Sequence, residues 1–155
     1  MLLRPLVRAV ARAAVRHREF GIADRVIVAV AFNPHKDSAL FTPTERVEMI
    51  DAVFQHYGGR VTADKFGGLL VDYVQQVGAK AIIRGLRAVA DFEYEFQMTM
   101  MNRHLKSDIE TIFMMAGEAH FYTSSRLVKE VVSLGGEVQG LVPDLVLHKL
   151  RKKVG

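Results

Sequence analysis

The sequence predicts a doubly wound α/β domain, in which helices cover both faces of a parallel sheet. Short apolar, β-branched runs alternate with amphipathic segments along most of the chain, as strand–helix–strand crossovers require. The run at 26–32 (VIVAVAF) is continuously apolar, which is typical of a buried parallel strand. Half of the 155 residues are hydrophobic, enough for the core of one domain. We therefore expect a single domain over residues 1–155.

Cap and turn signals divide the chain into elements. A helix is expected over 44–57, because Thr42 suits the N-cap, Pro43 the first turn, and Glu45 completes a capping box. Gly58 and Gly59 follow it as stop signals. Further helices are expected at 69–77, 90–105, 124–134 and 144–153, and further strands at 60–63, 81–83 and 111–115.

Two groups of side chains in these elements have structural interpretations. Methionine and aromatic residues fill buried faces, so we assign those of the 90–105 helix to the core or to subunit contacts. They are Phe92, Tyr94, Phe96, Met98, Met100 and Met101. The six histidines lack metal-ligand spacing, which predicts no bound structural metal. His35 and His120 fall in loops near the expected ligand edge.

Composition and charge narrow the class of partner. Cysteine is absent, which excludes disulfides, and the longest apolar run is too short to cross a bilayer. A net charge of +4 suits a site for phosphates, but it also suits nucleic acid. The middle of the chain has no Lys/Arg tract and no aromatic platform for single strands. A phosphate-bearing small molecule is therefore favoured over nucleic acid or a membrane, although a basic nucleic-acid-binding module remains as an alternative.

Three strand ends bring phosphate-binding residue types to one edge of the predicted sheet, where ligands of such folds bind. Lys36 follows the first strand, Arg84 and Arg87 follow the strand at 81–83, and a hydroxyl cluster at 123–125 begins a helix. Each feature alone is typical of a solvated turn or a helix cap. Together, a point charge, planar forks and helix-start hydroxyls predict a polyanion site.

Several segments resemble one enzyme family. The segment at 83–95 (IRGLRAVADFEYE) resembles the signature of bacterial phosphopantetheine adenylyltransferase. Shorter segments similar to that family are FTPTER at 41–46, GLLV at 68–71, MNRHL at 101–105, TSSRLVKE at 123–130 and GGEV at 135–138. The resemblance extends from Asp24 to about Leu150.

The resemblance implies a reaction, a fold, a metal cofactor, a cellular location and an oligomeric state. It implies transfer of AMP from ATP to 4′-phosphopantetheine, which gives dephospho-coenzyme A and pyrophosphate in coenzyme A biosynthesis. It also implies a Rossmann-like fold of the nucleotidyltransferase type, Mg²⁺ with ATP, a cytoplasmic location and a homo-hexamer. Product-like ligands, dephospho-coenzyme A and coenzyme A, are expected to bind. The chemistry needs alignment and positive charge rather than a covalent intermediate.

The resemblance also assigns roles to residues. Lys36 and Arg84 are expected to hold the phosphate of phosphopantetheine, with Leu70 lining its pocket. Lys36 and Arg87 are the expected catalytic residues. The residues expected to bind ATP are Gly85, Leu86, Arg87, Glu95, Tyr122, Thr123, Ser124, Ser125 and Arg126. Relatives often carry a small hydroxyl residue at the position of Arg126.

Residues 1–23 depart from the family, whose members begin with a strand and a Thr-x-Gly-His motif. Counting back from Asp24 places the expected Gly-His near Ala11 and Arg12, and no threonine precedes Thr42. Residues 5–18 instead predict one uninterrupted helix, rich in Ala, Leu and Arg. One interpretation is a replaced or misread first element packed on the sheet. The other is an Arg-rich, acid-poor targeting segment, although it lacks serine.

The missing motif bears on catalysis. Loss of one preorganised transition-state donor costs roughly a hundred- to a thousandfold in turnover. We therefore expect poor turnover, with Arg12 and His17 as candidates to replace the histidine. The alternative is a non-catalytic nucleotide- or coenzyme A-binding protein on the same scaffold.

Overall fold

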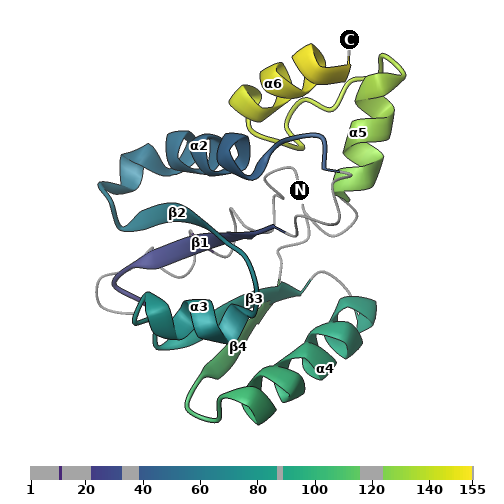
Figure 1. The fold of residues 1–155 in the computed structure, drawn as a ribbon. Helices are drawn as coiled ribbons and strands as arrows, with labels where there is room; N and C mark the ends of the chain where they lie inside the picture. Colours follow the sequence, from purple (N-terminus) through teal and green to yellow (C-terminus); the bar gives the residue numbers. More distant parts are fainter. Residues whose placement is uncertain (1–10, 12–21, 33–38, 87–88, 116–123, 155) are drawn as a thin grey trace.

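The computed structural model describes residues 11, 22–32, 39–86, 89–115 and 124–154. Strands and helices alternate along them, as Figure 1 shows, and this confirms the predicted Rossmann-like α/β class. The elements are β1 (Val26–Ala31), α2 (Pro43–Phe54), β2 (Val61–Phe66), α3 (Leu70–Gln76), β3 (Ala81–Leu86), α4 (Val89–Leu105), β4 (Glu110–Met115), α5 (Ser125–Ser133) and α6 (Asp144–Val154).

The described strands pair two by two, and both pairs are parallel. β1 pairs with β2, from Val26 opposite Val61, and β3 pairs with β4, from Ala81 opposite Glu110. Parallel pairing puts the carboxyl ends of the two strands of each ladder at the same edge. The residues that follow β1 and β3 are therefore the ones to examine for a ligand site.

Helix α2 begins as its sequence predicts. The Glu45 carboxylate accepts a hydrogen bond from the Thr42 backbone at 2.7 Å, and the Thr42 hydroxyl accepts one from the Glu45 backbone at 3.2 Å. This reciprocal capping box satisfies two backbone donors of the first turn. The α-helix ends at Phe54 rather than Tyr57, because the last turn tightens into a 3₁₀ turn that Gly58 terminates with a φ of 58°.

Two strands extend further than the sequence predicted. β2 runs over Val61–Phe66 rather than 60–63, and β3 continues past Ile83 to Leu86. Charged residues and glycine looked like strand ends, but a parallel neighbour pairs with their backbone groups and keeps them in the ladder. The other elements begin and end within one residue of the prediction.

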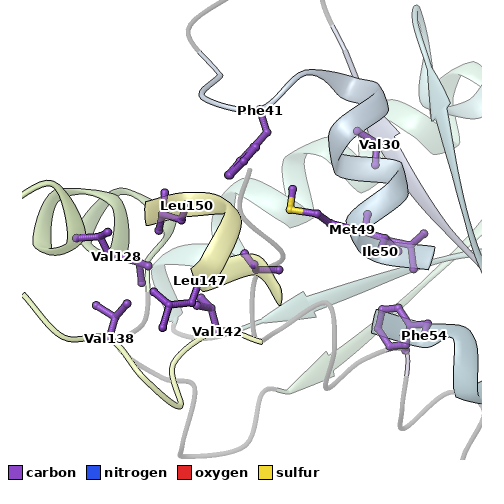
Figure 2. Packing of buried hydrophobic residues seen from close by; sticks show 14 of the residues in the cluster. Val30, Phe41, Met49, Ile50, Phe54, Val128, Val138, Val142, Leu147 and Leu150 are labelled. Carbon is purple, nitrogen blue, oxygen red and sulfur yellow. The ribbon is translucent and has the colours of Figure 1, made fainter. Parts of the chain in front are cut away.

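The larger of two hydrophobic cores lies between β1, α2, α5 and α6, as Figure 2 shows. Among its largest side chains are Phe41, Met49 and Phe54, each at most 2% exposed. Ala11 also belongs to this core and is helical and 2% exposed. The rest of the helix predicted over 5–18 lies outside the described residues. Close packing of this kind makes the core sensitive to any loss of volume.

The smaller core joins α3 to the β3–β4 ladder. Its described buried members are Val71, Val74, Ile82 and Ile109. Tyr73, also on α3, instead contacts β2: its ring stacks on Phe66 and its hydroxyl donates to Asp64 at 3.0 Å. α3 therefore links the two strand pairs.

Helix α4 presents its apolar side chains to the surface. The six residues predicted as core or subunit contacts are exposed, from 39% at Met98 to 63% at Tyr94. They do not belong to the core of the protomer, because they are spread around the helix and only part of its circumference can face the strands. No helix among the described residues is both long and apolar enough to cross a membrane.

The basic residues of α6 are largely paired with acids. Arg151 bonds to Glu137 at 2.8 Å, and the Lys153 ammonium lies 2.9 Å from Glu45. Lys149 lies 3.8 Å from Glu48. The positive charge of this helix is therefore largely balanced locally and does not by itself form a phosphate site.

Candidate functional site

Arg84 and Glu95 form the most fully defined part of the candidate site. Arg84 lies in β3, opposite Phe113 of β4. Its Nε donates to Glu95 Oε2 at 2.7 Å, and its Nη2 donates to Oε1 at 2.5 Å. The two parallel bonds make a bidentate guanidinium–carboxylate pair, which fixes the plane of the guanidinium.

Helix α4 is held against the ladder by aromatic and charged contacts on one side. Phe92 and Glu95 are three residues apart and therefore face the same way. The Phe92 ring lies 5.8 Å from that of Phe113, the residue opposite Arg84. An aromatic contact and an ion pair thus dock the same stretch of α4 onto neighbouring positions of β3 and β4.

Gly85 and Leu86 lie in β3 and not in a loop after it. Gly85 is opposite Met114, and Leu86 is opposite Met115. Leu86 is only 5% exposed, so its side chain belongs to the interior. The expectation that β3 stops before Gly85 is wrong, because β4 supplies a paired backbone as far as Met115.

The start of α5 combines a helix cap with an unpaired hydroxyl. Ser124 is the N-cap, and its hydroxyl accepts from the Leu127 backbone at 3.1 Å. This is the structural role that a helix-start serine has in many proteins. The Ser125 hydroxyl is buried and has no hydrogen-bond partner among the described residues. A free hydroxyl beside the first backbone N–H groups of a helix suits an anion.

Leu70 opens α3 and is partly buried against the smaller core. Leu69 before it is 53% exposed, so the chain enters α3 from the surface. An apolar side chain at this junction is compatible with the predicted pocket wall.

The remaining predicted site residues lie outside the described part of the chain. They are Lys36, Arg87, Tyr122 and Thr123, together with the loop histidines His35 and His120. The structure thus brings Arg84 and Glu95 together and defines the start of α5. The convergence of Lys36 and Arg87 on the same edge stays a prediction.

An open cavity of about 610 Å³ lies along α5 and includes one predicted site residue. Its described lining is Ala39, Leu40, Arg126, Lys129, Glu130, Ser133 and Val154. Arg84, Glu95 and Ser125 do not line it, so we do not assign the nucleotide to this cavity. Within the described ranges, no group of three or more His, Asp or Glu side chains could hold a metal ion.

Comparison with known proteins identifies the family. Residues 11–131 match the cytidylyltransferase-like family. The phosphopantetheine adenylyltransferase of Geobacter sulfurreducens is 54% identical over 136 residues, which cover 88% of this chain and 82% of the relative. That of Desulfosudis oleivorans is 48% identical over 132 residues, which cover 85% of this chain and 77% of the relative.

This chain belongs to the phosphopantetheine adenylyltransferase family. A third relative, from Nitratidesulfovibrio vulgaris strain DP4, is 52% identical over 134 residues, or 86% of this chain and 71% of the relative. Adenylyltransferases are nucleotidyltransferases, so the predicted family and enzyme class are confirmed.

The sequence of this phosphopantetheine adenylyltransferase family member did not reveal that Arg84 and Glu95 pair. The resemblance assigned Arg84 to phosphopantetheine and Glu95 to ATP, as if the two acted separately. The available signal was the opposite charge of the two residues, since a guanidinium binds a carboxylate with two parallel bonds. Confirming the pair required knowing which face of α4 meets β3.

Proposed function

We propose that this chain binds ATP and 4′-phosphopantetheine and transfers AMP between them, giving dephospho-coenzyme A and pyrophosphate. The observation that carries the proposal is the identity of about half to relatives named for this reaction, over 85% or more of the chain. The described fold and the exposed Arg84 fork also support it, because both suit a ligand that carries phosphate.

The proposed ligand contacts follow the family. Lys36, Leu70 and Arg84 bind 4′-phosphopantetheine. Gly85, Leu86, Arg87 and Glu95, together with the segment from Tyr122 to Arg126, bind ATP. The unpaired hydroxyl of Ser125 at the start of α5 supports a phosphate contact there.

The proposed reaction is a direct displacement at phosphorus. An oxygen of the phosphate of 4′-phosphopantetheine bonds to the α-phosphorus of ATP. The bond from that phosphorus to the bridging oxygen breaks, and pyrophosphate leaves. Lys36 and Arg87 supply positive charge where negative charge accumulates, and the protein aligns the two substrates.

Mg²⁺ fits this site as a companion of ATP rather than as a resident metal. The described residues offer no three-ligand His, Asp or Glu group, and Arg84 and Ser125 are not magnesium ligands of choice. Bound with ATP, Mg²⁺ would neutralise phosphate charge, and its ligands would come from the nucleotide and water rather than from these residues.

We further propose that turnover is low. The sequence contains no Thr-x-Gly-His motif, and no threonine precedes Thr42. A missing preorganised donor costs roughly a hundred- to a thousandfold in turnover. This observation also favours the second candidate function, a non-catalytic protein that binds nucleotide or coenzyme A.

The proposal includes a homo-oligomer, a hexamer by family, in the cytoplasm. Support for association comes from α4, where Tyr94, Phe96, Met100 and Met101 are each 48–63% exposed. Apolar surface of this extent on one helix is typical of a protein interface.

The test measures pyrophosphate release from ATP and 4′-phosphopantetheine with Mg²⁺, beside calorimetric binding of each ligand to purified protein. Turnover at a rate typical of metabolic enzymes, roughly 1–1000 s⁻¹, would contradict the proposed impairment. Binding of both ligands without turnover would support the non-catalytic candidate. Failure to bind either ligand would contradict the proposed enzyme function.

A further inference from the structure

Among the described residues, the guanidinium of Arg84 is bonded along one edge and has no partner along the other. The Glu95 carboxylate accepts hydrogen bonds from Nε at 2.7 Å and from Nη2 at 2.5 Å. These two nitrogens form the side edge of the guanidinium fork. A guanidinium has five N–H donors, so this pair uses two of them. Within the described residues the structure records no further hydrogen bond from Arg84. The end edge, formed by Nη1 and the second hydrogen of Nη2, therefore stays available.

The two partners differ in exposure. The Arg84 side chain is 43% exposed, whereas that of Glu95 is 15% exposed. Solvent screens an ion pair with one exposed partner, so its net contribution to stability is small. What the geometry supplies is orientation, because two parallel bonds from a rigid helix set both the position and the plane of the fork.

Orientation matters for a phosphate ligand. Arginine loses several side-chain rotations when it binds, and a fork that is already fixed loses less freedom on binding. The end edge of a guanidinium matches two oxygens of a phosphate monoester. Both carboxylate oxygens of Glu95 are already engaged by the guanidinium of Arg84.

We propose that Glu95 is a positioning residue for 4′-phosphopantetheine: it holds the Arg84 fork so that its open edge receives the phosphate of that substrate. Toward this phosphate, Glu95 thus acts through Arg84. This inference rests on the proposed function, because it takes the phosphopantetheine phosphate as the ligand of Arg84.

The experiment measures calorimetric binding of 4′-phosphopantetheine and of ATP, separately, to the full chain. Binding serves as the readout because it does not depend on turnover. The variants are Glu95→Gln, Glu95→Asp, Arg84→Lys and the double variant Arg84→Lys/Glu95→Gln. Glu93→Gln is the matched control, since Glu93 is an exposed acid on the same helix.

Glu95→Gln is expected to weaken 4′-phosphopantetheine binding on the order of tenfold, because an amide cannot accept both guanidinium bonds. The ATP measurement is a separate readout, because the proposed function also gives Glu95 an ATP contact. Glu95→Asp keeps the carboxylate and is expected to recover part of the loss. In the Arg84→Lys background, Glu95→Gln is expected to add little, since residues that act as one unit are not additive.

Three outcomes would overturn the inference. One is a loss of ATP binding with phosphopantetheine binding intact, which would leave Glu95 with a nucleotide contact alone. Another is full additivity of the two substitutions, and a third is no effect of Glu95→Gln on either ligand. If Glu95→Gln fails to fold, Glu95→Asp carries the same comparison. If the unaltered chain binds neither ligand, the proposed function fails and this inference fails with it. If the unaltered chain binds both ligands, a result that contradicts the prediction for Glu95→Gln counts against the role of Glu95 alone.

Discussion

The two strand pairs of this protein are supported in different ways. The first region, made of β1, β2, α2, α5 and α6, encloses the larger core, with Phe54 and Leu150 at most 1% exposed. The second region, made of β3, β4, α3 and α4, has a four-residue described core and an α4 that exposes Tyr94 and Met101.

The difference separates stability from recognition. The first region has the larger buried core, although Leu127 of α5 and Leu145 of α6 are exposed. The second region carries the Arg84–Glu95 pair and an apolar helix at the surface. We therefore expect substitutions in the first region to change folding, and those in the second to change association and ligand binding.

The largest expected effect is a loss of stability in the first region. Phe54→Ala removes a 1%-exposed aromatic ring from the larger core. Loss of a buried phenylalanine leaves a cavity and is expected to lower the free energy of unfolding by about 3–5 kcal/mol. Equilibrium unfolding in urea measures this. Gln97→Ala, at an exposed polar position of α4, is the control and is expected to stay within about 0.5 kcal/mol. Equal losses at the two positions would remove the distinction between the regions.

A second substitution tests the surface of α4. Met101→Glu places a charge on a 55%-exposed apolar position. If α4 lies in the interface of the proposed oligomer, burying an unpaired charge there raises the dissociation constant by at least about tenfold. Sedimentation velocity over a range of concentrations measures it, with Glu93→Gln as the control. Unchanged assembly would assign the interface to another surface.

A smaller effect concerns the start of α2 in the first region. Thr42→Ala removes the capping hydroxyl and is expected to cost about 1 kcal/mol of stability, while Thr42→Ser is expected to retain most of that stability.

Hydrogen bonds from Lys153 and then from the Thr42 backbone lower the pKa of Glu45 below its ordinary value of 4.5. Stability from this group is present above pH 4.5 and is lost as the pH falls through the lowered pKa.

The measurement is the free energy of unfolding across acid pH. Thr42→Ala is expected to show a slightly weaker pH dependence than the unaltered chain, because it removes the Thr42 side-chain hydrogen bond, the smallest cause of the lowered pKa, and keeps the backbone one. An identical pH dependence in the two proteins would mean that the capping box does not affect the titration of Glu45.

The smallest effect probes the link between the regions. Tyr73→Phe removes the hydroxyl that donates to Asp64 at 3.0 Å and is expected to cost about 0.5–1.5 kcal/mol. Burial, and then the hydrogen bond to Asp64, raise the pKa of Tyr73 from 10.0 to about 12. Protonated tyrosine is favoured in the folded state, so its contribution is complete below pH 10.0 and is lost as the pH rises toward 12.

Unfolding experiments between neutral and alkaline pH measure this contribution. Tyr73→Phe is expected to lack the alkaline decline that Tyr73 causes, and Tyr94→Phe, at an exposed position, is expected to keep it. A decline of the same size in Tyr73→Phe would assign the effect to another group.

The sequence by itself determined the order of the elements, the family, and those local structures whose partners are close along the chain. The capping box of Thr42 and Glu45 was predictable because its residues are three apart and their preferences act within one helical turn. The N-cap role of Ser124 was predictable for the same reason.

Only the tertiary structure decided where β3 ends, that Arg84 faces Glu95, and that α4 exposes its apolar side chains. Arg84 and Gly85 look like a loop until β4 supplies a paired backbone. Methionine and aromatic residues in α4 predict burial, but the helix touches the strands along one side only, so most of these side chains reach the surface. These features depend on contacts between segments far apart in the sequence, and local residue preferences do not encode which faces meet.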